Sequence, residues 1–173
     1  MTVIVVSGAP GTGKSTVAAA LAAAQQWPLL ALDAIKETLA DILGLGGEDW
    51  SGLLGDAAAE VVFRLSAQFP AAVAEGWWRG ARRERAFGAF AGAVEVFCYC
   101  DPQLAANRMR TRHSTARHPI HRDVINPSIM DRAATLAASV VPLNLGAALV
   151  KVDTGQAGAL DRAVAAVKAA LAN

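Results

Sequence analysis

Short apolar runs alternate with amphipathic segments along the whole chain. The β-branched or aromatic runs at 2–6, 94–99 and 149–152 predict buried strands, and the weaker runs 29–32 and 71–74 predict two more. Helical periodicity predicts helices at 14–24, 33–43, 56–68, 80–91, 101–112, 127–140 and 157–171, with irregular stretches at 7–13, 44–55 and 113–123. Since strands and helices alternate throughout, we expect an α/β fold in which helices cover both faces of one parallel sheet.

Composition narrows the class of protein. The chain has 173 residues, a length sufficient for one domain with its own core. Of these residues 54% are hydrophobic and 18% charged, a composition too apolar for intrinsic disorder. The net charge of +1 is low for a protein that binds nucleic acid by bulk electrostatics. Cys98 and Cys100 are the two cysteines, too few for a zinc site or a disulfide framework. We expect a single domain over 1–173, no nucleic-acid partner and a reduced, cytoplasmic location.

A membrane partner is not expected either. The longest uncharged stretch, residues 133–150, is interrupted by Pro142, Asn144 and Gly146. The N-terminus lacks the basic start of a signal peptide, and its apolar run is too short for one.

A glycine-rich turn between the first strand and the first helix fits the pattern G-x-x-x-x-G-K-[ST] at every fixed position. Its glycines let backbone N–H groups converge on a phosphate, and the helix that follows directs its positive end at the same anion. We expect Lys14 to bridge the β- and γ-phosphates and the Ser15 hydroxyl to hold Mg²⁺. The residues expected to contact the nucleotide here are Gly8, Ala9, Pro10, Gly11, Thr12, Gly13, Lys14, Ser15 and Thr16.

The run SGAPGTGKST at 7–16, followed by LDAIK at 32–36, resembles the P-loop small-molecule kinases. This group includes shikimate and gluconate kinases, chloramphenicol phosphotransferase and zeta-toxin-like kinases, and shares the nucleoside-monophosphate-kinase fold. The resemblance implies a three-layer P-loop NTPase fold with a five-stranded parallel sheet of order 2-3-1-4-5. It also implies ATP as donor, Mg²⁺ as cofactor and a small, mobile, arginine-rich lid.

Asp33 follows the second predicted strand, and sheets of this type bind ligands beyond the carboxyl ends of their strands. In similar kinases an aspartate at this place accepts the proton of the acceptor hydroxyl or helps to order Mg²⁺. Shikimate kinases carry D-x-D here, whereas the second position of this chain is Ile35. A third interpretation is that Asp33 is the N-cap of the helix that follows, which is compatible with either role.

Residues 108–122 contain five arginines, all three histidines of the chain and no acid. Such a segment repels itself unless an anion or an acid neutralises it, so we expect it to be mobile without nucleotide. Its place after the fourth strand matches the lid of similar kinases, at about 108–126, with Arg108, Arg112 and Arg117 acting on the transferring phosphoryl group. A solvated basic helix is the alternative. The roles of His113, His118 and His121 stay open.

Further candidates lie at two strand ends and in the glycine-rich stretch 44–55. Glu75 is either a site residue or a solvated strand end, and each of Trp50, Trp77 and Trp78 is either the wall of an acceptor pocket or core. By resemblance, Asp153 and Thr154 frame the adenine; otherwise they form a turn. The guanine signature Asn-Lys-x-Asp is absent from the sequence, which favours ATP over GTP.

These observations favour an ATP-dependent phosphotransferase that moves the γ-phosphate to a hydroxyl of a small polar metabolite or antibiotic. Residues 44–55 and 56–68 would form the acceptor side, and the protein would be a monomer or a homodimer. Two alternatives remain: a nucleotide or nucleoside kinase, which shares the fold, and a nucleotide-binding regulatory ATPase.

Replacing the loop lysine tests this interpretation. Lys14→Ala removes the charge that neutralises the β- and γ-phosphates, so ATP turnover should fall by at least about 10²-fold while the fold stays intact. Circular dichroism controls for folding. Unchanged turnover in a folded variant would contradict a kinase.

Overall fold

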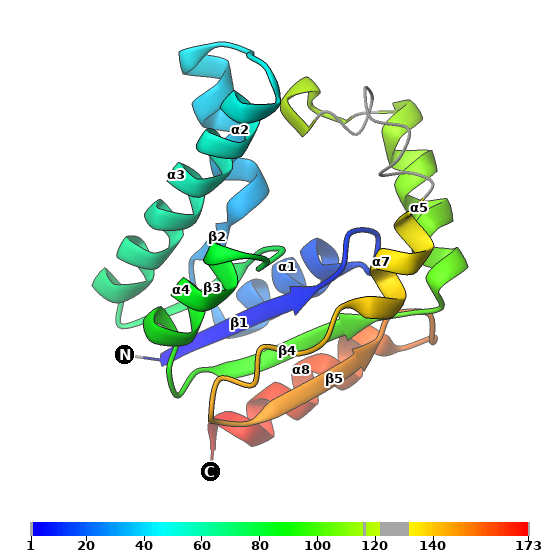
Figure 1. Ribbon diagram of the computed structural model, residues 1–173. Coiled ribbons are helices and arrows are strands. Elements are labelled where there is room, and N and C mark those ends of the chain that lie inside the picture. The colour runs from blue at the N-terminus through cyan, green and yellow to red at the C-terminus, as the bar shows by residue number, and fades with distance from the viewer. Residues whose placement is uncertain (1, 116, 122–131, 173) are drawn as a thin grey trace.

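In the computed structural model, a parallel five-stranded sheet of order β2-β3-β1-β4-β5 forms the centre of the molecule (Figure 1). The structure describes residues 2–115, 117–121 and 132–172, apart from the side chains of 113–115. The strands are β1 (Thr2–Gly8), β2 (Leu29–Ala31), β3 (Ala71–Glu75), β4 (Val94–Tyr99) and β5 (Leu149–Asp153). Both the fold class and the predicted strand order are therefore confirmed.

Helices cover both faces of this sheet and make three layers (Figure 1). The covering helices are α1 (Lys14–Gln25), α3 (Glu48–Gln68), α4 (Ala81–Ala89) and α8 (Ala159–Leu171). Side chains alternate between the faces of β1: Val3 and Val5 pack under α3 and α4, while Ile4 and Val6 pack under α1 and α8. Because both faces are buried, the strand reads as a continuous apolar run.

Three further helices lie nearer the carboxyl edge of the sheet: α2 (Leu32–Leu43), α5 (Pro102–Thr115) and α7 (Ala133–Ser139), with a short 3-10 turn, η1 (Pro119–His121). Asp101 caps α5, since its Oδ1 accepts from the backbone N–H groups of Gln103 at 2.9 Å and Leu104 at 3.0 Å. The helix predicted at 127–140 begins at Ala133 in the described part of the chain, and residues 127–131 lie outside it.

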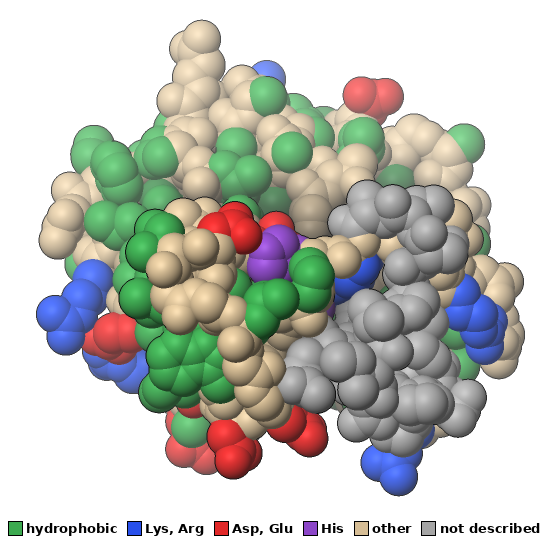
Figure 2. Space-filling view, turned by 90° about the horizontal axis from the view of Figure 1, so that it is seen from above, with side chains coloured by type: hydrophobic (Ala, Val, Ile, Leu, Met, Phe, Trp, Pro, Cys, Tyr) green, Lys and Arg blue, Asp and Glu red, His purple; other side chains and the backbone are tan. Residues whose placement is uncertain are grey.

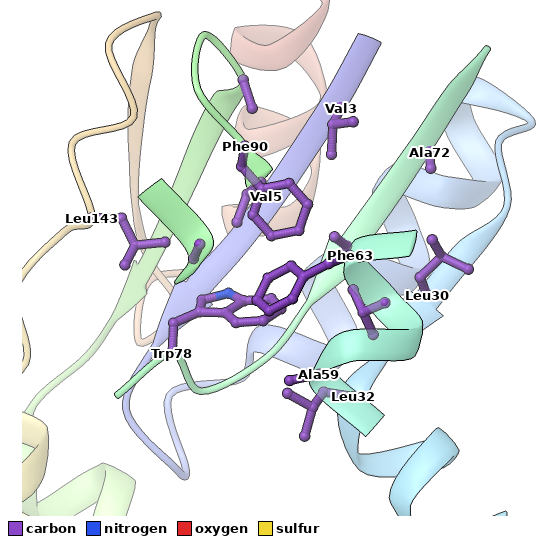
Figure 3. Close-up of a cluster of buried hydrophobic side chains, with 14 of the residues drawn as sticks. Val3, Val5, Leu30, Leu32, Ala59, Phe63, Ala72, Trp78, Phe90 and Leu143 are labelled. Carbon is purple, nitrogen blue, oxygen red and sulfur yellow. The ribbon is translucent and has the colours of Figure 1, made fainter. Parts of the chain in front are cut away.

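The largest buried side chains on the α3/α4 face form an aromatic cluster. The rings of Phe63, Trp78 and Phe90 pack with centroids 5.4–5.5 Å apart (Figure 3). Trp78 is 4% exposed and so belongs to the core rather than to a pocket wall. Trp77 is half-buried, and the guanidinium of Arg79 lies 4.4 Å from its ring centroid.

The predicted irregular stretch at 44–55 is wrong over most of its length, because α3 begins at Glu48. Tertiary packing outweighs the low helix propensity of its glycines. A Cβ on Gly55 would lie 2.5 Å from the guanidinium of Arg82, so this glycine lets Arg82 pack against the helix. The indole of Trp50 donates to the carbonyl of Gly44 at 3.0 Å and closes the remaining loop.

A buried carboxylate, which the apolar pattern of 94–99 concealed, ties the sheet to the chain that leads into β5. Glu95 is 1% exposed and accepts hydrogen bonds from the Ser7 hydroxyl at 2.6 Å and from the backbone N–H groups of Leu143 at 2.7 Å and Asn144 at 2.8 Å. Asn144 has a positive φ of 63°, which asparagine tolerates better than most residues. Glu95 therefore fixes the turn before β5.

Among the residues described, no helix combines the length and the apolar character that crossing a membrane requires.

Removing the Glu95 carboxylate should cost much of the stability. Glu95→Ala leaves two buried donors and the partly buried Asn144 N–H without an acceptor, so the free energy of unfolding should fall by about 3–5 kcal/mol. Ser7→Ala is the matched control: it removes one donor and should cost about 1 kcal/mol. Urea denaturation measures both. Equal losses in the two variants would show that Glu95 does not anchor the β5 turn.

Candidate active site

Chain segments that follow β1, β2, β3 and β5 meet at one edge of the sheet, because parallel strands all end on the same side. The phosphate loop leaves β1 at Gly8, α2 leaves β2 at Leu32, and Glu75 ends β3. Gly11 and Gly13 have φ values of 79° and 78°, a left-handed conformation that glycine adopts without strain. A Cβ on Gly11 would also collide with the carbonyl of Ala105, so α5 packs directly on the loop.

Within the loop, the carbonyl of Ala9 organises two polar side chains. It accepts from the Thr12 hydroxyl at 2.7 Å and from the Lys14 ammonium at 3.1 Å. Lys14 is only 9% exposed, so its charge is held close to the backbone cradle rather than in solvent. An anion in the cradle would compete with Ala9 for this ammonium.

A cavity of about 640 Å³ opens beside the loop. This volume is in the range of small-molecule and cofactor sites. Its lining includes loop residues, two arginines of α5 and the first turn of α8. The predicted site residues among them are Gly11, Gly13, Lys14, Ser15, Thr16, Arg108, Arg112 and Thr154.

Thr154 connects three elements around this cavity. Its hydroxyl donates to the carbonyl of Thr12 at 2.9 Å and accepts from Arg108 at 3.0 Å, while a second nitrogen of Arg108 donates to the Thr154 carbonyl at 3.0 Å. Arg108 thus braces the β5 loop against the phosphate loop. Asp153 instead accepts from the backbone N–H of Gly155 at 2.9 Å, as in a turn, and is not among the residues that line the cavity.

Asp33 lies in the first turn of α2 and its side chain is half-exposed. Burial raises the pKa of this carboxyl, but the nearby His121, Arg117, Lys14 and Arg112 act in the opposite direction and together hold its pKa below the usual range. The N-cap of α2 is Ala31, so the interpretation of Asp33 as the N-cap of this helix is wrong. Its ionised carboxylate is available to a ligand.

Glu75 lies beside the same group of charges. It is 5% exposed, which excludes a solvated strand end, and the nearby Ser15 side chain acts to lower the pKa of its carboxyl. Burial raises the pKa of Glu75, with Lys14 acting against this and Asp33 adding to it. The sequence could not decide between a site residue and a solvated strand end, because the short apolar run before Glu75 does not indicate which side chains lie near its carboxylate.

The three predicted lid arginines separate into two groups. Arg108 and Arg112 line the cavity, while Arg117 approaches the Asp33 carboxylate at 3.4 Å. His118 and His121 contact acids of α2 that the sequence analysis did not single out, Asp41 at 3.1 Å and Glu37 at 2.6 Å. Their signal was the spacing of acids four residues apart on one helix face. The side chain of His113 and lid residues 122–126 lie outside the described residues.

In the described chain, no group of three or more His, Cys, Asp or Glu side chains could hold a metal ion by itself. This donor set fits Mg²⁺ nonetheless, because that ion keeps several waters and takes few protein oxygens, with phosphates completing its shell. Its candidate ligands are the Ser15 hydroxyl and the nearby carboxylates of Glu75 and Asp33.

A glycine loop between a buried strand and a helix, with a lysine held over its cradle, defines a P-loop nucleotide-binding protein. The family model described as "AAA domain" matches residues 3–134, and the chain belongs to that family. No curated protein matches the chain.

Solved structures show the same architecture. A suspected kinase from Chloroflexus aurantiacus is 28% identical, with a TM-score of 0.87 and 97% of each chain covered. A gluconokinase from Sinorhizobium meliloti is 22% identical, with a TM-score of 0.64, over 99% of this chain and 91% of the other. The shikimate-bound shikimate kinase from Acinetobacter baumannii is 20% identical, with a TM-score of 0.67, over 100% and 94%. The fold is therefore that of P-loop kinases.

Thr154→Val should weaken nucleotide binding without unfolding the protein. Valine keeps the shape but loses the bridge between the phosphate loop and Arg108, so the Kd for ATP should rise roughly 3- to 10-fold. Titration calorimetry measures it, with Thr2→Val at the exposed start of β1 as the control. An unchanged Kd would show that the bridge does not support the site.

Proposed function

We propose that this protein is an ATP-dependent phosphotransferase that moves the γ-phosphate to a hydroxyl of a small polar metabolite or antibiotic. The observation that carries this proposal is the position of Asp33. Its carboxylate lies in the electrostatic reach of Lys14 and Arg112, which line the cavity, yet it belongs to α2, which follows β2 on the other side of the phosphate loop. A carboxylate so placed faces the far end of a bound triphosphate.

Each group then has a definite task. The loop N–H groups and Lys14 bind the β- and γ-phosphates, and Arg112 and Arg117 stabilise charge on the transferring phosphoryl group. Asp33 orients the acceptor hydroxyl and takes its proton as the oxygen bonds to γ-phosphorus and the bond to the ADP oxygen breaks. Ser15, with Glu75 or Asp33 behind it, would hold Mg²⁺, which supplies further charge neutralisation when bound.

Other P-loop activities remain as alternatives. A nucleotide or nucleoside kinase shares the fold, and a regulatory ATPase shares the phosphate loop. The convergence of Arg112 and Arg117 on Asp33 supports phosphoryl transfer over switching, because a switch needs no acceptor-side carboxylate. The suspected kinase at 28% identity is consistent with this choice.

The direct experiment is ATP turnover with and without a panel of hydroxyl-bearing compounds: sugars, sugar acids, cyclic polyols, nucleosides and hydroxylated antibiotics. We expect one class to stimulate ADP release and to gain a phosphate, which mass spectrometry detects. Stimulation by nucleosides or nucleotides alone would favour the first alternative, and hydrolysis that no acceptor changes would favour the second.

Asp33→Asn separates the proton acceptor from nucleotide binding. The variant keeps the side-chain size and loses the base, so transfer should slow by about 10²–10⁴-fold. ATP affinity without Mg²⁺ should stay near normal, because Asp33 lies on the acceptor side. If ATP affinity collapses only when Mg²⁺ is present, Asp33 orders the metal instead.

The pH profile of the wild-type enzyme gives a second check on Asp33. Its pKa lies below the ordinary value of about 3.9, so the carboxylate stays ionised from pH 8 to pH 5. Transfer should therefore show no loss from Asp33 protonation in that window. An acid limb that disappears in Asp33→Asn would contradict this.

A further inference from the structure

One face of α2 carries a row of three acidic residues. The proposed chemistry uses only the first of them, Asp33. Asp33, Glu37 and Asp41 are four residues apart, so they lie on three successive turns of the same face. The described segment 117–121 lies along this row. Arg117 pairs with Asp33 at 3.4 Å, His121 with Glu37 at 2.6 Å and His118 with Asp41 at 3.1 Å.

An apolar contact and a buried hydrogen bond hold the same segment. Ile120 is 1% exposed and packs against Ala40 of α2 and Leu54 of α3. The hydroxyl of Ser51 donates to the Ile120 carbonyl at 2.6 Å and accepts from the Lys36 ammonium at 2.8 Å. In the view from above, histidine lies among acidic and hydrophobic side chains (Figure 2). The segment is therefore docked on α2 and α3 by more than ion pairs.

The hydrogen bonds of His118 define its tautomer in the docked segment. Its Nδ1 accepts from the backbone N–H of Ile120 at 3.2 Å, so Nδ1 carries no proton. Nε2 then carries the proton and donates to Asp41. His118 therefore joins Asp41 of α2 to the backbone of its own segment.

We infer that Glu37 and Asp41 are positioning residues: through His121 and His118 they dock segment 117–121 on α2 and α3 without nucleotide, and so hold Arg117 beside Asp33. The docking itself stands on the contacts above; its effect on catalysis rests on the proposed function. The docking also brings acidic residues of α2 next to the basic run at 108–122, which contains no acid of its own. Arg117 is then already in place when a triphosphate arrives. The triphosphate competes with Asp33 for the Arg117 guanidinium.

The docked segment weakens in acid. Burial lowers the pKa of His121, and Arg117 and Lys36 act in the same direction, against Asp33 and Glu37. Docking then binds fewer protons than the free segment does, so it is at full strength above about pH 6.5, the ordinary histidine value, and weakens as the pH falls below that.

Amide exchange of the peptide that covers 117–121, in the nucleotide-free protein, tests the docking. Glu37→Gln and Asp41→Asn keep hydrogen-bonding side chains but lose the charges, so each should raise the exchange rate about fivefold. Glu84→Gln, an exposed acid of α4, should leave it unchanged. Protection of the wild type should fall between pH 7.5 and 5.5 after correction for intrinsic exchange. Equal exchange in all variants would overturn the inference.

Steady-state transfer with the acceptor found above tests the positioning. In Glu37→Gln and Asp41→Asn, kcat should fall about 3- to 10-fold while KM for ATP changes less than about twofold, because the phosphate loop is untouched. Faster exchange with an unchanged kcat would overturn the positioning role. Faster exchange in a protein that phosphorylates no acceptor would leave the docking supported and refute the proposed function.

Discussion

The parallel direction of all five strands is the constraint on which the site depends. It brings the ends of β1, β2, β3 and β5 to one edge, although the residues that follow these strands are far apart in sequence. The phosphate loop, Asp33, Glu75 and Thr154 meet there for that reason alone. The two-sided helical cover and the Glu95 anchor keep this edge fixed, because they hold the sheet and the turn into β5 in register.

The parts of the fold that the sequence predicts best are those with a local signal. Buried parallel strands read as apolar runs, and the phosphate loop has a spacing imposed by its ligand. The start of α3 could not be predicted, since its first turns contain Gly52 and Gly55 and form because of packing against other elements. The role of Glu95 could not be predicted either, because the three donors to its carboxylate come from distant parts of the chain, Ser7 and the turn at 143–144.

The candidate site divides in the same way. Lys14 and Asp33 were identifiable from a motif and from a strand end, whereas Glu75 and Trp78 needed the structure to show which side chains they meet. The basic run at 108–122 posed a question about charge that local sequence could not answer. Its partners on α2 are about 80 residues away, at 77 residues for His118 and Asp41 and 84 for the other two pairs. Only the four-residue spacing of the acids hinted at them.

The account requires that the loop lysine and the acceptor-side carboxylate address the same γ-phosphate. A crystal structure with a non-hydrolysable ATP analogue and Mg²⁺ tests this most directly. We expect the Lys14 ammonium to leave the Ala9 carbonyl, which it now contacts at 3.1 Å, and to lie between the β- and γ-phosphates. The γ-phosphate should point toward Asp33. A nucleotide whose γ-phosphate points away from Asp33, or whose phosphates leave Lys14 on Ala9, would contradict it.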